Sequence, residues 1–164
     1  MTSTVTTGNL VVTISESIVL NGERQGGVTT KVIPSINEIV KRIVTIPTTE
    51  TGLLGLAPHM YSNLALSHVC GVFDEDDARY IRITNLDDSN HVTLTFRSEG
   101  NAEFAVKLDA GHSFIYPGDN GGGMVDTMDA AAGAIGTPSF EDLVDITALA
   151  DTASCDIEVF VASA

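Results

Sequence analysis

Hydrophobic and polar side chains alternate in two neighbouring stretches of the chain, residues 79–85 and 91–97. In the first stretch Ile81 and Ile83 share one face, and in the second Leu94 and its apolar neighbours at i−2 and i+2 do the same. A period of two is typical of a strand with one buried face. The residues between the stretches are mostly Asp, Ser and Asn, which favour turns. The sequence therefore predicts two half-buried strands joined as an antiparallel hairpin.

Similar short runs recur along the chain and are separated by turn-forming residues. The further strands that we expect are residues 9–14, 17–20, 28–33, 103–108, 113–116, 145–150 and 155–161. Asn21-Gly22 begins a loop that continues to Gly26-Gly27, because these residues tolerate positive φ. About eight to ten short strands predict an all-β domain, an antiparallel β-sandwich or jelly-roll-like barrel. We expect residues 1–164 to form this single domain.

The segment 35–46 is compatible with two structures. Ser35 and Glu38 form a helical capping box, and apolar residues follow at helical spacing. Against a helix, β-branched residues dominate the segment and Pro47 ends it. We therefore expect a strand with an irregularity.

Two segments have compositions that do not favour regular structure. Residues 1–8 are rich in Thr and Ser and predict a flexible N-terminal arm. Residues 118–138 are rich in Gly, Ala and Asp and contain Gly121-Gly122-Gly123. Such a run has too little apolar surface to order itself, and a loop this long in a compact domain is usually functional or mobile. We expect a long mobile loop there.

The chain is strongly acidic, with 22 acidic and 8 basic residues and a formal net charge of −14. Such a surface repels nucleic-acid phosphate and anionic lipid, so we expect neither nucleic acid nor membrane as a partner. The N-terminus lacks the charged and apolar regions of a signal peptide. We expect a reducing cytoplasm as the place of synthesis, with Cys70 and Cys155 as free core thiols.

Few residue patterns point to chemistry. Carboxylates in two polar turns are candidate calcium ligands, but their spacing does not fit a calcium-binding loop, and solvated turns are the favoured interpretation. These candidates are Asp74, Asp76, Asp87 and Asp88. The four histidines are scattered, and neither a nucleophile elbow nor a phosphate-binding loop occurs. We therefore expect no enzymatic activity, no cofactor and no resident metal.

Asparagines and arginines mark the predicted hairpin. Asn85 and Asn90 flank its turn, and we expect them to cap it through hydrogen bonds to the backbone. Arg82 and Arg97 belong to its outer face, where pairing with carboxylates such as Glu103 is the ordinary role. Contact with a partner is the alternative role for both arginines.

Several segments resemble a small β-protein family of tailed bacteriophages, by pattern more than by identity. That family shows an I-x-N-L-D pattern followed by K-L-x-x-G. The similar segments here are residues 80–87, 91–94, 104–116 and the closing 151–159, with 10–22 and 41–47 resembling marine-phage members. The glycine-rich segment 118–138 departs from the family pattern.

The resemblance implies a non-enzymatic virion structural protein without catalytic residues. It implies a capsid decoration or cement protein, assembled in the host cytoplasm, that binds the major capsid protein at the capsid surface as a homo-oligomer, with a trimer favoured. The contact residues expected are Thr2, Thr4, Thr6, Thr7, Gly121, Gly122, Met124, Met128, Arg82 and Arg97.

Two other functions stay open. The protein could instead belong to the tail, neck or a fibre of the same virion, where its copy number would be low. A calcium- or carbohydrate-binding β-sandwich is the alternative of a different class. It needs exposed aromatic side chains, and the chain has no Trp and three tyrosines, Tyr61, Tyr80 and Tyr116.

Overall fold

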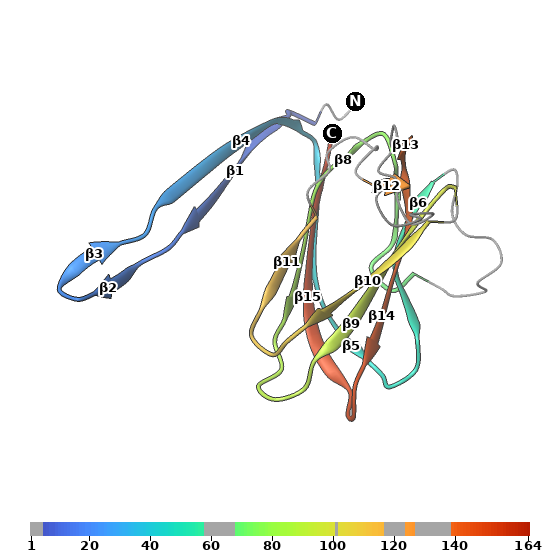
Figure 1. Cartoon of the computed structure of the whole chain (residues 1–164). Coiled ribbons are helices and arrows are strands. Elements are labelled where there is room, and N and C mark those ends of the chain that lie inside the picture. The colour runs from blue at the N-terminus through green and yellow to red at the C-terminus, as the bar shows by residue number, and fades with distance from the viewer. Residues whose placement is uncertain (1–4, 58–67, 101, 117–123, 127–138) are drawn as a thin grey trace.

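The computed structural model describes residues 5–57, 68–100, 102–116, 124–126 and 139–164. All regular structure in this part of the chain is β-strand, which confirms the predicted fold class. The strands form a β-sandwich from which a long hairpin projects (Figure 1). The structure therefore has two parts, a sandwich with a hydrophobic core and a two-stranded ribbon that projects from it.

Two sheets face one another in the sandwich. The four-stranded sheet has the order β11 (Ser113–Ile115), β8 (Ala78–Asn85), β15 (Cys155–Ser163) and β5 (Glu38–Ile46). The five-stranded sheet has the order β10 (Glu103–Leu108), β9 (Val92–Ser98), β14 (Leu143–Ala150), β6 (Thr51–Ala57) and β7 (Val72–Asp74). Neighbours are antiparallel except β6 and β7, which are parallel.

The core lies between the sheets and is built by the inward residues of each alternating strand. Phe96 is fully buried at its centre, with its ring stacked on that of Phe104 at 4.7 Å between centroids. The rings of Phe114 and Tyr116 approach Phe96 at 5.0 and 5.9 Å from the opposite sheet and its end. Aliphatic side chains fill the rest of this layer, and both cysteines are buried there as free thiols, as predicted.

The predicted hairpin of residues 79–97 is wrong in its pairing, although both strands exist. β8 pairs with β11 and β15, whereas β9 pairs with β10 and β14 in the other sheet. Residues 86–91 therefore cross from one sheet to the other. The alternation requires only that Ile81, Ile83 and Phe96 turn to a core. Two strands facing each other across a sandwich satisfy this as well as two strands side by side.

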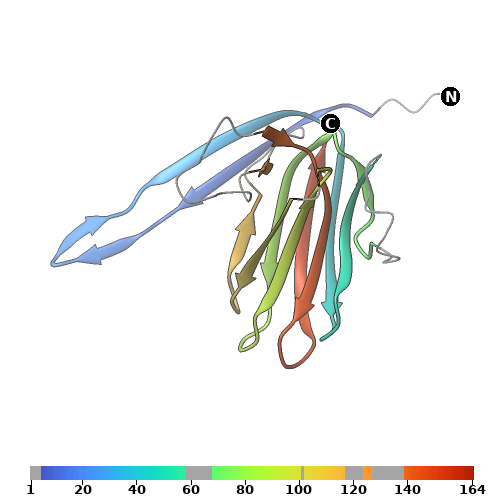
Figure 2. The ribbon, with the colours of Figure 1, turned by 45° about the vertical axis from the view of Figure 1, so that its right-hand side comes forward.

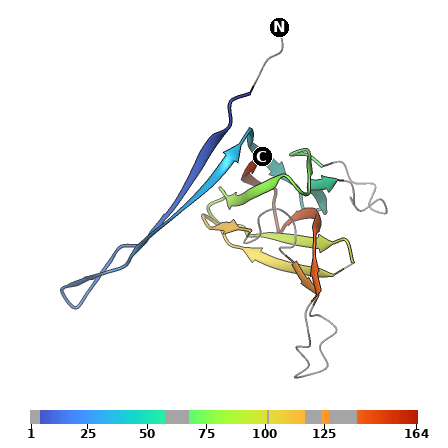
Figure 3. The ribbon, with the colours of Figure 1, turned by 90° about the horizontal axis from the view of Figure 1, so that it is seen from above.

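The projecting hairpin, here called the arm, comprises residues 8–36. β1 (Gly8–Ser15) pairs with β4 (Val28–Ile36), and near the tip β2 (Ile18–Leu20) pairs with β3 (Glu23–Gln25). The tip lies far from both sheets in all three views (Figures 1, 2 and 3). The flexible arm of residues 1–8 stays a prediction, because residues 1–4 lie outside the described part. The hairpin that begins at Gly8 is a further projecting element that the sequence did not reveal.

Glycines and an asparagine at positive φ shape the end of the arm. Asn21 (φ 53°) and Gly22 (φ 81°) form the two-residue turn of the tip, as their chemistry predicts. The predicted loop 21–27 is too long, because its middle forms β3. Gly26 has φ 125°, and a Cβ there would lie 2.2 Å from the backbone oxygen of Glu16. Only glycine fits this close crossing of the two strands.

The base of the arm contains a bulge. The return strand was expected to end at Pro34, but β4 continues to Ile36. Its register with β1 shifts between Gly8 and Leu10, so that extra residues are accommodated, and Ser35 there has φ 64°. Proline has no amide to donate to a ladder, and a bulge tolerates it. Residues 38–46 then form β5, which confirms the strand interpretation over the helical one.

The predicted mobile loop 118–138 falls mostly outside the described residues. Its described part is β12 (Met124–Asp126), which pairs with β13 (Ser139–Glu141). The segment thus contains one short strand, and the mobile loop stays a prediction for the rest of it.

The stacked rings provide a test of the core. We expect Phe96→Ala to lower the free energy of unfolding by about 3–5 kcal/mol, because it removes a fully buried ring and leaves a cavity. Leu86→Ala is the control, since Leu86 is 46% exposed and its truncation costs about 0.5 kcal/mol or less. Urea denaturation followed by circular dichroism measures both values. Equal losses for the two variants would contradict the assigned core.

Candidate interaction surface

The arm exposes large hydrophobic side chains on both faces. Among the described residues, seven of the fourteen exposed large hydrophobic side chains belong to it. They are Val11 (58% exposed), Ile14 (48%), Ile18 (55%), Val19 (64%), Leu20 (51%), Val28 (68%) and Val32 (50%). Isolated exposed hydrophobic residues are ordinary, but a contiguous set marks an interaction surface. The arm is therefore the strongest candidate site in the described structure.

Only the base of the arm is covered by its own sandwich. Ile33 and Ile36 are buried against Tyr80 and Ala162 on the outer face of the four-stranded sheet. Leu10, Val12, Ile115 and Phe160 extend this second small core. Beyond it, no layer formed by the described residues covers either side of the ribbon. A two-stranded ribbon is at best marginally stable in water, so the outer part needs a partner to cover it.

A groove runs between the arm and the four-stranded sheet. One wall is strand β1, with Leu10, Val12 and Ile14, and the floor is the outer face of the sheet, with Arg82 and Phe160. A neighbouring hollow at the base of the arm is lined by Thr6, Leu10 and Ile39, among others. The groove is apolar along the arm and carries charge along its floor, which suits an amphipathic segment.

The charge on this floor is an ordered row of ion pairs. Glu158 lies 2.7 Å from the guanidinium of Arg82 and 3.0 Å from the ammonium of Lys41, the distances joining nitrogen and carboxylate oxygen. Hydrogen bonds from Arg82 and then Lys41 hold the pKa of Glu158 below its usual value. Arg82 also lies over the ring of Phe160, 5.9 Å from its centroid. Arg82 is thus held by its own sheet.

Beside this row, strand β5 presents two exposed isoleucines. Ile39 and Ile43 are 56% and 62% exposed, and they flank Lys41 with the same outward alternation. β5 pairs with β15 on one side. The outer face of the sheet therefore continues the apolar surface of the groove.

Arg97 lies on the opposite side of the molecule, on the five-stranded sheet. Its guanidinium contacts Glu103 at 2.7 Å, Glu50 at 2.8 Å and Asp145 at 3.4 Å, and it donates a hydrogen bond to Thr147. These bonds confirm pairing with Glu103 as its role. Arg82 and Arg97 do not share one face, since their strands belong to different sheets.

One polar pair beside Arg97 could not be inferred from the sequence. Nε2 of His68 lies 2.7 Å from Oδ1 of Asp145, whose side chain is only 2% exposed. Asp145 is therefore shared by His68 and Arg97. His68 and Arg97 precede Asp145 by 77 and 48 residues in the sequence, so no local pattern links them to it. The group is satisfied internally and anchors residue 68 to the sheet.

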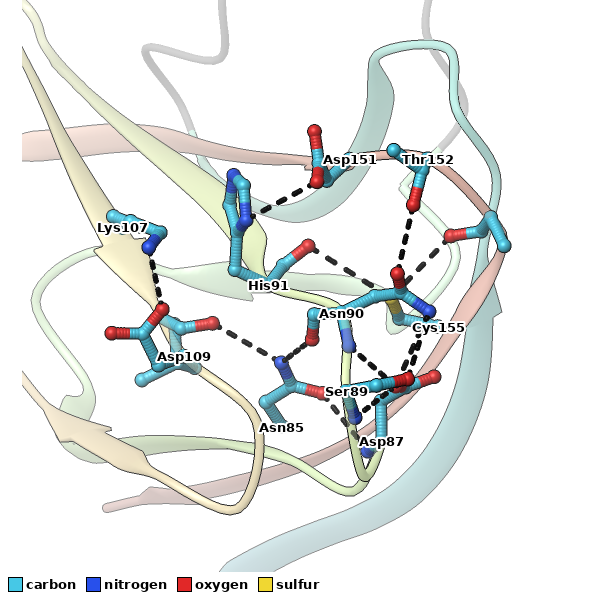
Figure 4. A network of polar contacts seen from close by, with 12 residues as sticks. Asn85, Asp87, Ser89, Asn90, His91, Lys107, Asp109, Asp151, Thr152 and Cys155 are labelled. Carbon is cyan, nitrogen blue, oxygen red and sulfur yellow. Dashed lines mark hydrogen bonds and ion pairs between the residues drawn. The ribbon is translucent and has the colours of Figure 1, made fainter.

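The carboxylates proposed for calcium are engaged in turns. Oδ1 of Asp87 accepts hydrogen bonds from the amides of Ser89 and Asn90 at 2.9 and 2.7 Å (Figure 4). These amides hold the pKa of Asp87 below its usual value. Asp74 accepts the amide of Asp76 in the same manner, and Asp88 accepts the hydroxyl of Ser89. The part of the chain that the structure describes contains no group of three or more side chains able to hold a metal.

Asn85 organises this end of the sandwich (Figure 4). Its side chain is fully buried, and its amide donates to the carbonyl oxygens of Asn90 and Leu108 at 2.9 and 3.1 Å. Its side-chain oxygen accepts the amide of Asp87 at 3.0 Å. The predicted capping role is confirmed for Asn85, which joins the crossing loop to strand β10 rather than closing a hairpin. It is wrong for Asn90, whose side chain bonds the side chains of Thr152 and Asp87 and not the backbone.

The remaining predicted contact residues are placed only in part. Thr6 and Thr7 are exposed and lead into β1, and Met124 begins β12. The others, Thr2, Thr4, Gly121, Gly122 and Met128, lie outside the described residues. The sequence predicts strands at residues 9–14 and 28–33 but does not indicate that they form a projecting ribbon. No signal in the sequence shows that the side chains of its outer part stay exposed on both faces.

Comparisons with known proteins identify no family or relative for this chain. No protein-family model matches the chain, no curated protein matches it, and no solved structure matches it. Within the described residues, no helix has the length and apolar character needed to cross a membrane.

The network of Asn85 generates a stability prediction. We expect Asn85→Ala to lower the free energy of unfolding by roughly 2–3 kcal/mol, because two buried carbonyl groups and one amide lose their partner. Asn90→Ala is the matched control, whose side chain is less buried and bonds Thr152 instead. We expect it to cost under about 1 kcal/mol. A loss for Asn90→Ala as large as that for Asn85→Ala, in chemical denaturation, would contradict the assigned role.

The ion pairs of Glu158 generate a pH prediction. Because the folded-state pKa is lowered from 4.5, this carboxylate stabilises the fold fully above pH 4.5, and the contribution disappears as pH falls through the folded-state pKa. Glu158→Gln should therefore be less stable than the wild type at pH 7, with the difference vanishing in acid. Urea denaturation over this pH range measures it. Glu38→Gln, at the exposed start of β5, serves as control, and a pH-independent deficit in Glu158→Gln would oppose the prediction.

Proposed function

We propose that this chain is a non-enzymatic virion structural protein, a decoration or cement protein that binds the major capsid protein and stabilises the capsid shell. The observation that carries the proposal is the arm, a regular hairpin whose apolar side chains stay exposed among the residues that the structure describes. Binding of the arm to a neighbouring protein would bury these side chains. The resemblance to small phage β-proteins suggests the phage capsid as the assembly that it joins.

The strand order of the sandwich supports this proposal. β5-β15-β8-β11 faces β6-β14-β9-β10, with β7 added at one edge. Apart from the β9–β10 hairpin and the added strand, successive strands alternate between the two sheets. This order is compatible with a jelly roll, a fold that viral capsid domains and lectins share. A fold hosts many functions, so the order supports the proposal without deciding it.

Cementing requires reach, adhesion and rigidity, and the chain has a part for each. The arm provides reach and apolar surface, whose burial contributes about 25 cal/mol for each Å² removed from water. The sandwich provides a rigid body with a continuous core. Weak contacts repeated at many equivalent sites stabilise a shell by mass action and by avidity. The proposed location is the capsid surface, after assembly in the host cytoplasm.

The two alternatives differ in support. A tail, neck or fibre component would use the same arm, and its copy number separates it from a cement protein. The lectin alternative needs exposed aromatic side chains. Tyr80 and Tyr116 are only 9% and 7% exposed, and Tyr61 lies outside the described residues. The described surface therefore does not favour sugar binding.

The copy number of the chain tests the proposed function. Quantitative mass spectrometry of purified particles of the encoding phage should give a number comparable with that of the major capsid protein, because a cement protein repeats with the shell. Digested peptides of the major capsid protein in the same particles provide the internal control. Only a few copies per particle would support the tail or neck alternative, and absence from the particles would contradict a virion role.

A further inference from the structure

Charge is divided very unevenly along the chain. Residues 1–46 contain four basic and three acidic residues, a net charge of +1. Residues 47–164 contain the other four basic and nineteen acidic residues, a net charge of −15. The arm and β5 are thus the acid-poor part of a strongly acidic protein. Two sandwich bodies approaching through their other surfaces repel each other.

The acid-poor part is also where the exposed apolar side chains gather. In the described residues, ten of the fourteen exposed large hydrophobic side chains lie between Val5 and Ile43. Seven of them belong to two separate surfaces. One is the tip of the arm, around Ile18, Val19 and Leu20, and the other is the receiving face, which we define as the groove together with Ile39 and Ile43.

We propose that the tip of the arm of one copy binds the receiving face of a second copy of this chain. The charge division argues for this occupant, because this approach brings acid-poor surfaces of both copies together. Apolar side chains of the tip would cover Ile39, Ile43 and the groove. Beside the groove lies the exposed side chain of Lys41, which is paired with Glu158, and the tip carries Glu16, Glu23 and Arg24.

The dimensions of the arm allow this contact. A strand rises about 3.3 Å per residue, so residues 13–20 extend roughly 25 Å beyond the covered base. Neighbouring strands lie about 4.8 Å apart, so this length exceeds the roughly 15 Å spanned by the strands of the four-stranded receiving sheet. The tip of one copy can therefore lie across the outer face of a neighbour. The tip projects away from the receiving face of its own copy, whereas the base of the same arm forms one wall of the groove (Figures 2 and 3).

The contact joins two different surfaces and is therefore heterologous. Repetition of such a contact builds a ring where the rotation closes, which is compatible with the trimer that the resemblance implies. The inference deepens the proposed function by naming what the arm binds. It rests on the surfaces of the chain alone and is tested without capsids, so that its failure and the failure of the virion role are distinguishable.

The test is the oligomeric state of the purified full-length chain. Light scattering coupled to size exclusion should show a concentration-dependent oligomer for the wild type. Val19→Asp alters the tip and Ile43→Glu alters the receiving face, at side chains 64% and 62% exposed. Each change should weaken association roughly tenfold or more, because it places a charge in an apolar contact. Leu86→Asp, at an exposed hydrophobic residue away from both surfaces, should associate like the wild type.

Mixing the two variants provides the decisive experiment. Val19→Asp keeps an intact receiving face and Ile43→Glu keeps an intact tip, so the mixture should form a one-to-one complex although each variant alone is monomeric. Circular dichroism melting checks that both variants are folded, and Ile39→Thr replaces Ile43→Glu if the latter unfolds. A wild type that stays monomeric, variants that associate like it, or a mixture without a complex would overturn the inference. A monomeric wild type whose binding to capsids requires Val19 would assign the arm to the shell instead.

Discussion

A strand can satisfy its backbone with one or two neighbours, but its two side-chain faces need separate cover. This constraint divides the chain. In the sandwich, each sheet covers the inner face of the other, and the outward faces carry ion pairs such as the row through Glu158. In the arm, the described part of the chain provides no second layer beyond the base, so that side chains such as Val19 and Val28 remain exposed. What the fold leaves uncovered is the part that we assign to interaction.

The covered and uncovered parts are joined at one place. Ile33 and Ile36 at the base of the arm are buried on Tyr80 and Ala162, and the chain then enters β5 at the edge of the same sheet. The arm is thereby held at a defined angle to the sandwich rather than attached through a free linker. A fixed direction suits an element that must reach the same position on every neighbour, because less conformational entropy is lost on binding.

Sequence patterns predicted the strands well and their neighbours poorly. The alternation around Ile81, Leu94 and Phe96 shows which side chains are buried. It does not indicate whether two strands are neighbours in one sheet or face each other from two sheets. The same limit hid the arm, since strands in a covered sheet and in a bare ribbon can alternate alike. Local chemistry was more reliable, as at Asn21-Gly22 and Asn85. The pair of His68 and Asp145 joins residues too distant for any local signal.

The central claim is that the outer arm depends on a partner for its stability, whereas the sandwich does not. Amide hydrogen exchange of the full chain, measured by mass spectrometry in dilute solution and again in the assembled state, tests it most directly. We expect amides of residues 13–30 to exchange far faster than those of β15 in dilute protein and to become protected on assembly. An arm as protected as β15 in the dilute monomer, or one whose exchange is unchanged by assembly, would contradict the account.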